Sequence, residues 1–125
     1  YWDGGITDYH LHLDWQTPPD RPEGRIVLYP HFQRQVVPGW LDKALKWRHC
    51  PTAFLDHTVV LAPNPEWVRQ LPNAKLPDRT DFFTYGQDLQ ARVQAWTTAT
   101  RAAQQLADEF AQWLERPDPG RVQPL

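Results

Sequence analysis

The stretch DFFTYGQDLQARVQAWTTATRAAQQLADEFAQWLE, residues 81–115, decides the fold of this chain more than any other part. Apolar side chains recur in it at steps of three or four residues, which is the pattern of an amphipathic helix. These apolar positions are Phe82, Tyr85, Leu89, Val93, Trp96, Ala99, Ala103, Leu106, Phe110 and Leu114. We predict one long helix over residues 86–115, with Asp81 as its N-cap and Pro117 as its stop. Its apolar stripe is stable only when it packs against a sheet or a partner. We expect Trp96 to lie in the hydrophobic core that this packing forms.

The preceding part of the chain is rich in proline and predicts short elements joined by turns. Most of the thirteen prolines lie before residue 80. Residues 6–13 alternate between apolar and polar side chains, which is typical of a half-buried strand. Residues 25–29 and 58–62 are short aliphatic runs closed by Pro30 and Pro63, so each predicts a buried strand.

Two short helices complete the expected elements. Residues 40–48 combine aliphatic and tryptophan side chains in a helical spacing, and Asn64-Pro65-Glu66 is a typical helix start for a segment ending near Leu71. Loops are expected over residues 14–24 and 72–80. The resulting order is strand, strand, helix, strand, helix, long helix, which is typical of the α/β class. We assign residues 1–116 to the folded part and expect residues 117–125 to be a frayed tail.

Composition excludes several classes of protein. The chain has 125 residues, with 13 basic against 15 acidic side chains and a net charge of −2, so it lacks the basic excess of a nucleic-acid binder. Its mean hydropathy is −0.67, and no apolar run approaches the roughly 18 residues of a membrane span. One cysteine, Cys50, permits no internal disulfide and no cysteine-based zinc pattern, and we expect it to be a buried or half-buried thiol. The sequence contains neither serine nor methionine, so we expect a piece of a longer protein without a serine nucleophile of its own.

Residues 1–11, YWDGGITDYHL, resemble the segment around the Asp-Gly-Gly motif of bacterial patatin-like phospholipases. Later stretches are similar to the C-terminal part of the same family. They are Leu28-Tyr29-Pro30-His31-Phe32, Pro38-Gly39-Trp40-Leu41-Asp42-Lys43, and the long helix with Tyr85-Gly86 before it. The resemblance covers about residues 1–115. Where plant-type patatins follow the motif with Asn-Pro, this chain has Thr7-Asp8-Tyr9.

The resemblance implies a serine lipid acyl hydrolase with a Ser-Asp dyad on a three-layer α/β/α fold. Asp3 would be the dyad aspartate, and Gly4 and Gly5 would be the glycines of its turn. The Gly-x-Ser-x-Gly nucleophile and the oxyanion loop would lie on an upstream part of the same protein, so this chain alone is expected to be inactive. The resemblance implies no cofactor, a lipid or acyl-ester substrate, and a cytoplasmic, membrane-peripheral location.

Asp8-Tyr9-His10-Leu11-His12 supports an alternative from another class. Asp-x-His-x-His begins the first strand of several metal-dependent hydrolases, and a strand would place His10 and His12 on one face. The side chains that could complete such a zinc site are His31, His49, Asp56 and His57. A polar strand face bonded to neighbouring loops explains the same residues without a metal.

A non-catalytic interaction or lid module is the third reading. The tryptophans of the proline-rich half would then form a binding surface, whereas core packing and loop anchoring explain the same residues without one. Trp40 and Trp47 stand among basic residues, which makes residues 40–48 the best candidate for a peripheral membrane contact. The basic residues are Lys43, Lys46 and Arg48.

Overall fold

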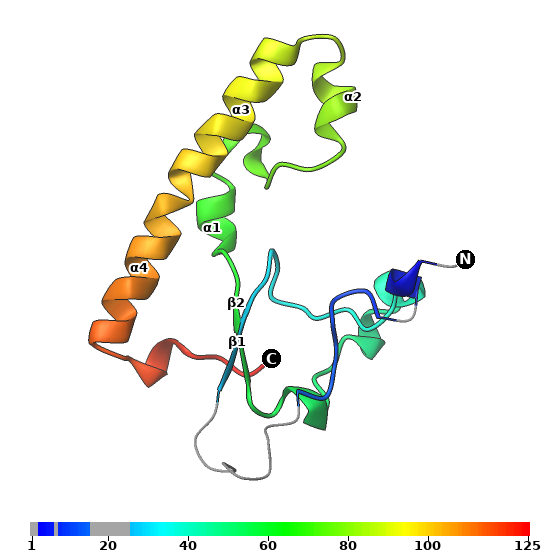
Figure 1. Cartoon of the computed structure of the whole chain (residues 1–125), viewed down its shortest axis with the longest axis vertical. Coiled ribbons are helices and arrows are strands. Elements are labelled where there is room, and N and C mark those ends of the chain that lie inside the picture. The colour runs from blue at the N-terminus through cyan, green and yellow to red at the C-terminus, as the bar shows by residue number, and fades with distance from the viewer. Residues whose placement is uncertain (1–2, 7, 16–25) are drawn as a thin grey trace. The chain divides into compact units, whose positions relative to one another are not determined.

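The computed structural model describes residues 3–6, 8–15 and 26–125 of the chain. These residues combine two parallel strands with short helical turns and a long C-terminal helix, and most of the regular structure is helical (Figure 1). The predicted α/β class is confirmed at that level. The chain divides after residue 62 into two compact units.

The first unit contains the sheet, which consists of β1 (Val27–Pro30) and β2 (Thr58–Leu61). The strands lie side by side (Figure 1) and are parallel, with their first residues opposite one another. Both aliphatic runs of the sequence therefore form strands, as predicted. They are not fully buried, however, because β1 alternates between half-buried and exposed residues and β2 is half-buried throughout. A two-stranded parallel sheet leaves much of its faces and edges open, whereas parallel sheets are normally covered on both sides.

The predicted strand over residues 6–13 is wrong. Gly4–Ile6 form a single 3₁₀ turn, η1, and residues 8–15 belong to no strand; residue 7 lies outside the described residues. Leu11 has a φ of +50°, a left-handed conformation that interrupts any extended run. The two-residue alternation of side chains is therefore lost at this position.

The predicted helix over residues 40–48 is present as two 3₁₀ turns, η2 (Trp40–Ala44) and η3 (Lys46–Arg48). Leu45 separates them with φ −99° and ψ 69°. Backbone hydrogen bonds nevertheless continue at a spacing of three residues, because the N–H groups of Leu45 and Arg48 each donate over 2.8 Å to the carbonyl three positions earlier. The segment is thus wound more tightly than an α-helix. A further turn, η4 (Ala53–Leu55), precedes β2.

The second unit, residues 63–124, begins with the short helix α1 (Pro65–Val68). Its start is as predicted, because the Asn64 side chain accepts a hydrogen bond of 2.8 Å from the Glu66 N–H. The helix ends earlier than expected and is followed by a 3₁₀ turn, η5 (Pro72–Ala74).

The long predicted helix is present as α3 (Leu89–Ala102) and α4 (Gln104–Glu115). Ala103 between them keeps helical backbone angles, so 27 residues follow one line (Figure 1). The helix begins three residues later than expected. Its N-cap is Asp88, whose side chain accepts a hydrogen bond of 2.9 Å from a backbone N–H of the first turn.

The predicted N-cap role of Asp81 is wrong. Asp81 is the first residue of a separate helix, α2 (Asp81–Tyr85), and its side chain is buried. Gly86 ends α2 with a φ of +51°, a conformation that glycine adopts at little cost. This glycine turn breaks the single helix that the apolar spacing suggested.

The core of the second unit is small. Trp67, Leu71 and Ala99 are its buried centre, and half-buried side chains pack around them. These surrounding residues are Val68, Leu76, Ala102 and Leu106. The apolar stripe of the long helix is only partly used, because several of its members are more than half exposed. They are Phe82, Leu89, Val93 and Leu114.

Residues 117–125 are exposed throughout. They contain one 3₁₀ turn, η6 (Pro119–Arg121), which Asp118 caps through its side chain. The indole N–H of Trp113 donates to the Asp118 carbonyl over 3.3 Å, so the turn is tied to the end of α4.

Candidate functional site

Asp3 lies at the head of the η1 turn with its side chain exposed. Its Oδ1 accepts a hydrogen bond of 2.7 Å from the Gly5 N–H, and its carbonyl accepts one of 3.1 Å from Ile6 N–H. A side chain at Gly5 would bring Cβ to 3.1 Å from Asp3 Oδ1, which is closer than most real contacts. A Cβ at Gly4 would have no neighbour within 4 Å. A side chain at the second glycine of the motif would therefore displace Asp3 Oδ1 slightly, and Asp3 Oδ2 is left open among the described residues.

The η1 turn packs against η2. The Tyr9 N–H donates to the Pro38 carbonyl over 2.8 Å. Gly39 is buried, and a Cβ there would lie 2.9 Å from both the Ile6 carbonyl oxygen and Asp42 Oδ2. This close backbone approach requires glycine at position 39. Two stretches far apart in the sequence, around Asp3 and around Gly39, are thus brought together.

Lys43 completes the contact between these stretches. Its Nζ lies 3.9 Å from the centre of the Tyr9 ring and 5.5 Å from that of Trp40. Both distances fall in the range of cation–π attraction. The ammonium is held over aromatic rings at the exposed surface of this segment.

His10 is buried, with 5% of its surface exposed. Its Nδ1 accepts a hydrogen bond of 2.9 Å from the Val37 N–H, so in the neutral ring the proton lies on Nε2. Nε2 has no hydrogen-bond partner among the described residues. Burial lowers the pKa of His10 from 6.5 to about 4, and the neighbouring His31 acts in the same direction. His10 is therefore a neutral core residue at pH 7.

The hydrogen bond to Nδ1 is the opposite of what a metal ligand needs. A ligating histidine binds the metal through one nitrogen while the other donates its N–H to a neighbour. In His10 one nitrogen already accepts from the backbone and the other carries the proton. His10 would have to change tautomer and give up the Val37 bond before it could bind zinc.

His12 lies in different surroundings. Its Nε2 is 2.7 Å from the Thr52 hydroxyl oxygen, and its ring meets Phe54 edge-on with centroids 6.0 Å apart. Asp8, the acid of the same motif, accepts the backbone N–H of His12 over 2.8 Å. The left-handed Leu11 separates the two imidazoles, so the structure does not bring His10 and His12 to a shared point.

The other predicted metal-site residues are also engaged separately. His31 Nδ1 donates to the Gln33 carbonyl over 2.6 Å, and His49 Nε2 donates to the Asp42 carbonyl over 2.8 Å. Asp56 and His57 are exposed. Within residues 3–6, 8–15 and 26–125, no three His, Cys, Asp or Glu side chains come close enough to hold a metal ion.

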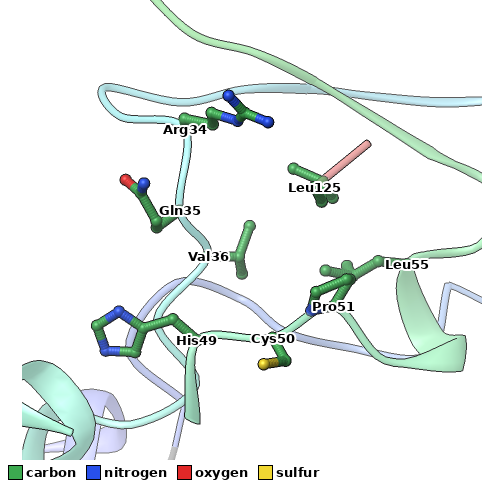
Figure 2. A pocket seen from close by; sticks show the side chains of 8 residues that line it. All are labelled: Arg34, Gln35, Val36, His49, Cys50, Pro51, Leu55 and Leu125. Atoms are coloured by element: carbon green, nitrogen blue, oxygen red, sulfur yellow. The ribbon is translucent and has the colours of Figure 1, made fainter. Parts of the chain in front are cut away.

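Cys50 is exposed, so the expected burial of its thiol is wrong. It borders a shallow pocket of about 180 Å³ (Figure 2). The lining side chains are Arg34, Gln35, Val36, His49, Cys50, Pro51, Leu55 and Leu125. The Cys50 thiol lies 3.4 Å from the Trp47 carbonyl, while the neighbouring His49 ring bonds to a carbonyl elsewhere. The two side chains do not form a nucleophile–base pair.

Three side-chain contacts could not be predicted from sequence patterns. The Tyr29 hydroxyl on β1 donates to the His10 carbonyl, and burial raises the pKa of that hydroxyl, with Asp8 adding to the effect. In the second unit, Asp81 accepts from Trp96 and pairs with Lys75. None of these three pairs follows the spacing of a helix or a strand, so the sequence carries no local signal for them.

Comparisons with protein-family models, with curated proteins and with solved structures find no match for this chain. The candidate site is therefore argued from its geometry alone. Its central feature is an exposed carboxylate at the head of a glycine turn, held against a second segment of the chain.

Proposed function

We propose that this chain is the C-terminal segment of a patatin-like serine lipid acyl hydrolase and supplies the aspartate of its Ser-Asp dyad. The observation that carries the proposal is the position of Asp3. Its carboxylate is exposed, one oxygen is fixed by the Gly5 N–H, and the other is open among the described residues. A carboxylate oriented in this way is suited to accept a proton from a hydroxyl group brought next to it.

In the proposed reaction, Asp3 takes the proton of an upstream serine as the serine oxygen attacks the ester carbonyl. The alcohol leaves with that proton, and an acyl-enzyme remains. Asp3 then removes a proton from water as the water oxygen attacks the acyl-enzyme, and it passes that proton to the departing serine oxygen when the fatty acid is released. The oxyanion would be held by the upstream glycine-rich loop, and no cofactor takes part.

The open sheet is evidence for a second part of the same protein that packs against this chain. Parallel strands are normally covered on both faces, and a two-stranded sheet is rarely stable alone. Three large apolar side chains in or near β1 are nevertheless at least about half exposed. They are Ile26, Leu28 and Phe32. We propose that β1 and β2 are two strands of a larger three-layer α/β/α fold that the upstream part completes.

We place the protein in the cytoplasm of a bacterium as part of the same proposal. Among the described residues, no helix is both long enough and apolar enough to cross a membrane. The proposed substrate is a lipid or another acyl ester, and nucleic acid is not expected as a partner.

The test is reconstitution of the dyad. This chain is mixed with the polypeptide encoded directly upstream, and the mixture is treated with a fluorophosphonate that labels active serines. We expect labelling and hydrolysis of p-nitrophenyl esters only when both parts are present, because an aspartate without a nucleophile forms no acyl-enzyme. Ester hydrolysis that persists through repurification of the 125-residue chain alone would refute the proposal. An upstream sequence without Gly-x-Ser-x-Gly would refute it equally.

A further inference from the structure

The segment from Trp40 to Arg48 has one side turned inward and the rest turned to solvent. Its 3₁₀ winding brings every third residue into line. Asp42 and Leu45 are half-buried, and the guanidinium Nε of Arg48 lies 3.0 Å from Asp42 Oδ1. The Asp42 carbonyl also accepts the hydrogen bond from His49. Asp42 and Leu45 therefore lie on the side that faces the rest of the first unit, while Arg48 pairs with Asp42 and is itself exposed.

The outward side carries large apolar groups. Trp40, Leu41 and Trp47 are 52%, 67% and 72% exposed. Two tryptophans and a leucine on nine residues are a high density for a surface that faces only water. Tryptophan has an apolar ring with one polar N–H, which suits it to a boundary between an apolar and a wet phase.

The outward side is also positively charged. Asp42 is the acid within residues 40–48, and it pairs with Arg48. Lys43 and Lys46 remain, both exposed, and Lys43 is held over the Tyr9 and Trp40 rings. The segment with the exposed tryptophans therefore carries two exposed ammonium groups, and that of Lys43 lies 5.5 Å from the centre of the Trp40 ring.

We propose that this outward side, formed by Trp40, Leu41, Lys43, Lys46 and Trp47, binds the surface of an anionic lipid membrane. The charge decides between a lipid and a protein occupant. The centres of protein–protein interfaces are depleted in lysine, whereas exposed tryptophan and lysine together are typical of segments that lie at the headgroup level. The indoles enter the headgroup layer while the ammonium groups attract acidic lipids. This binding is independent of the proposed hydrolase activity.

The test is sedimentation of the 125-residue chain with vesicles of phosphatidylcholine alone or with 30% phosphatidylserine added. We expect binding to the anionic vesicles, weak binding to the neutral ones, and loss of binding as salt is raised. The double variant Lys43→Gln/Lys46→Gln should weaken binding by about fivefold per lysine. Trp40→Ala/Trp47→Ala should weaken it while leaving its dependence on salt unchanged.

The matched control is Phe83→Ala, which removes an aromatic side chain that is 86% exposed in α2. It should bind vesicles as the unchanged chain does. Far-UV circular dichroism of every variant checks that the fold is retained. Three outcomes would overturn the proposal: no binding to anionic vesicles, equal binding to neutral ones, or equal loss with Phe83→Ala. If Trp40 and Trp47 instead bind the upstream polypeptide and no vesicle, the occupant is a protein and the proposal is wrong.

Discussion

The indole N–H of Trp96 donates to Asp81 Oδ2 over 2.8 Å, and this bond joins α3 to the first residue of α2. The other oxygen, Asp81 Oδ1, lies 2.7 Å from Lys75 Nζ, so the carboxylate is paired although only 2% of the residue is exposed. The backbone N–H of Asp78 also donates to Oδ2, over 3.1 Å. One buried carboxylate therefore holds the loop before α2, α2 itself and α3 together.

Trp96→Phe tests the hydrogen bond separately from the ring. Phenylalanine can keep the edge-on contact with Phe82, whose centroid is 6.0 Å from that of Trp96, but it leaves Asp81 without the indole donor. In Trp96→Phe we expect the free energy of unfolding to fall by about 1–2 kcal/mol, because the hydrogen bond is lost. In Trp96→Ala we expect it to fall by about 2–3 kcal/mol, because the whole half-buried side chain is removed. Urea unfolding followed by circular dichroism measures both values. Equal stability of Trp96→Phe and the unchanged chain would show that the bond contributes nothing.

Asp81→Asn tests the ion pair with Lys75. The Lys75 ammonium holds the pKa of Asp81 below its usual 3.8, so the carboxylate stabilises the fold above about pH 4 and loses this effect as the pH falls further. We expect Asp81→Asn to lower the Tm at pH 7 and to flatten the fall of Tm below pH 4. Thermal unfolding at pH 7 and pH 3 gives both quantities. Glu115→Gln, at the exposed end of α4, is the matched control and should change neither.

His10→Asn tests the buried imidazole. Because the pKa of folded His10 is lowered to about 4, protonation favours the unfolded chain, so stability is complete above about pH 6.5 and declines as the pH falls toward 4. The decline amounts to as much as ~3 kcal/mol. Asparagine keeps an acceptor for the Val37 N–H but does not titrate, so its stability should vary less between pH 7 and pH 4.5. The exposed His57→Asn serves as control, and an unchanged pH profile in His10→Asn would contradict the assignment.

Gly39→Ala tests the contact between η1 and η2. A Cβ at this position would lie 2.9 Å from the Ile6 carbonyl oxygen, so the two turns must separate. We expect a loss of about 1–3 kcal/mol and faster hydrogen exchange at the Tyr9 N–H, which bonds to the Pro38 carbonyl. Gly4→Ala, with no atom within 4 Å of its Cβ, should leave the exchange rate unchanged. Equal protection in both variants would mean that the turns do not depend on this approach.

Asp3→Asn, made in the full-length protein that contains this chain, separates the two catalytic readings. Asparagine keeps the shape but cannot accept the serine proton, so turnover should fall by ~10²–10⁴-fold with little change in substrate binding. His10→Ala and His12→Ala should retain most of the turnover, and a chelator should have no effect. A metal-dependent hydrolase would give the opposite pattern. Near-normal turnover of Asp3→Asn would end the dyad proposal.

Several elements could be predicted because their signals are local. The Asn64 cap, the aliphatic runs of β1 and β2 and the helix over 89–115 depend on residues within a few positions of one another. The Asp-Gly-Gly turn belongs to the same group, since its central hydrogen bond spans two residues. For such elements, side-chain spacing and capping chemistry are enough.

What only the tertiary structure decided lies between residues distant in the sequence or depends on a single backbone angle. The buried state of Asp81 depends on Trp96, 15 residues away, and the tautomer of His10 depends on the Val37 N–H, 27 residues away. The left-handed Leu11 separates two histidines that an alternating pattern would place together. Periodicity in the sequence records which side chains are apolar and at what spacing. It carries no information on which distant polar group will satisfy a buried one, because that pairing is settled only when the segments pack.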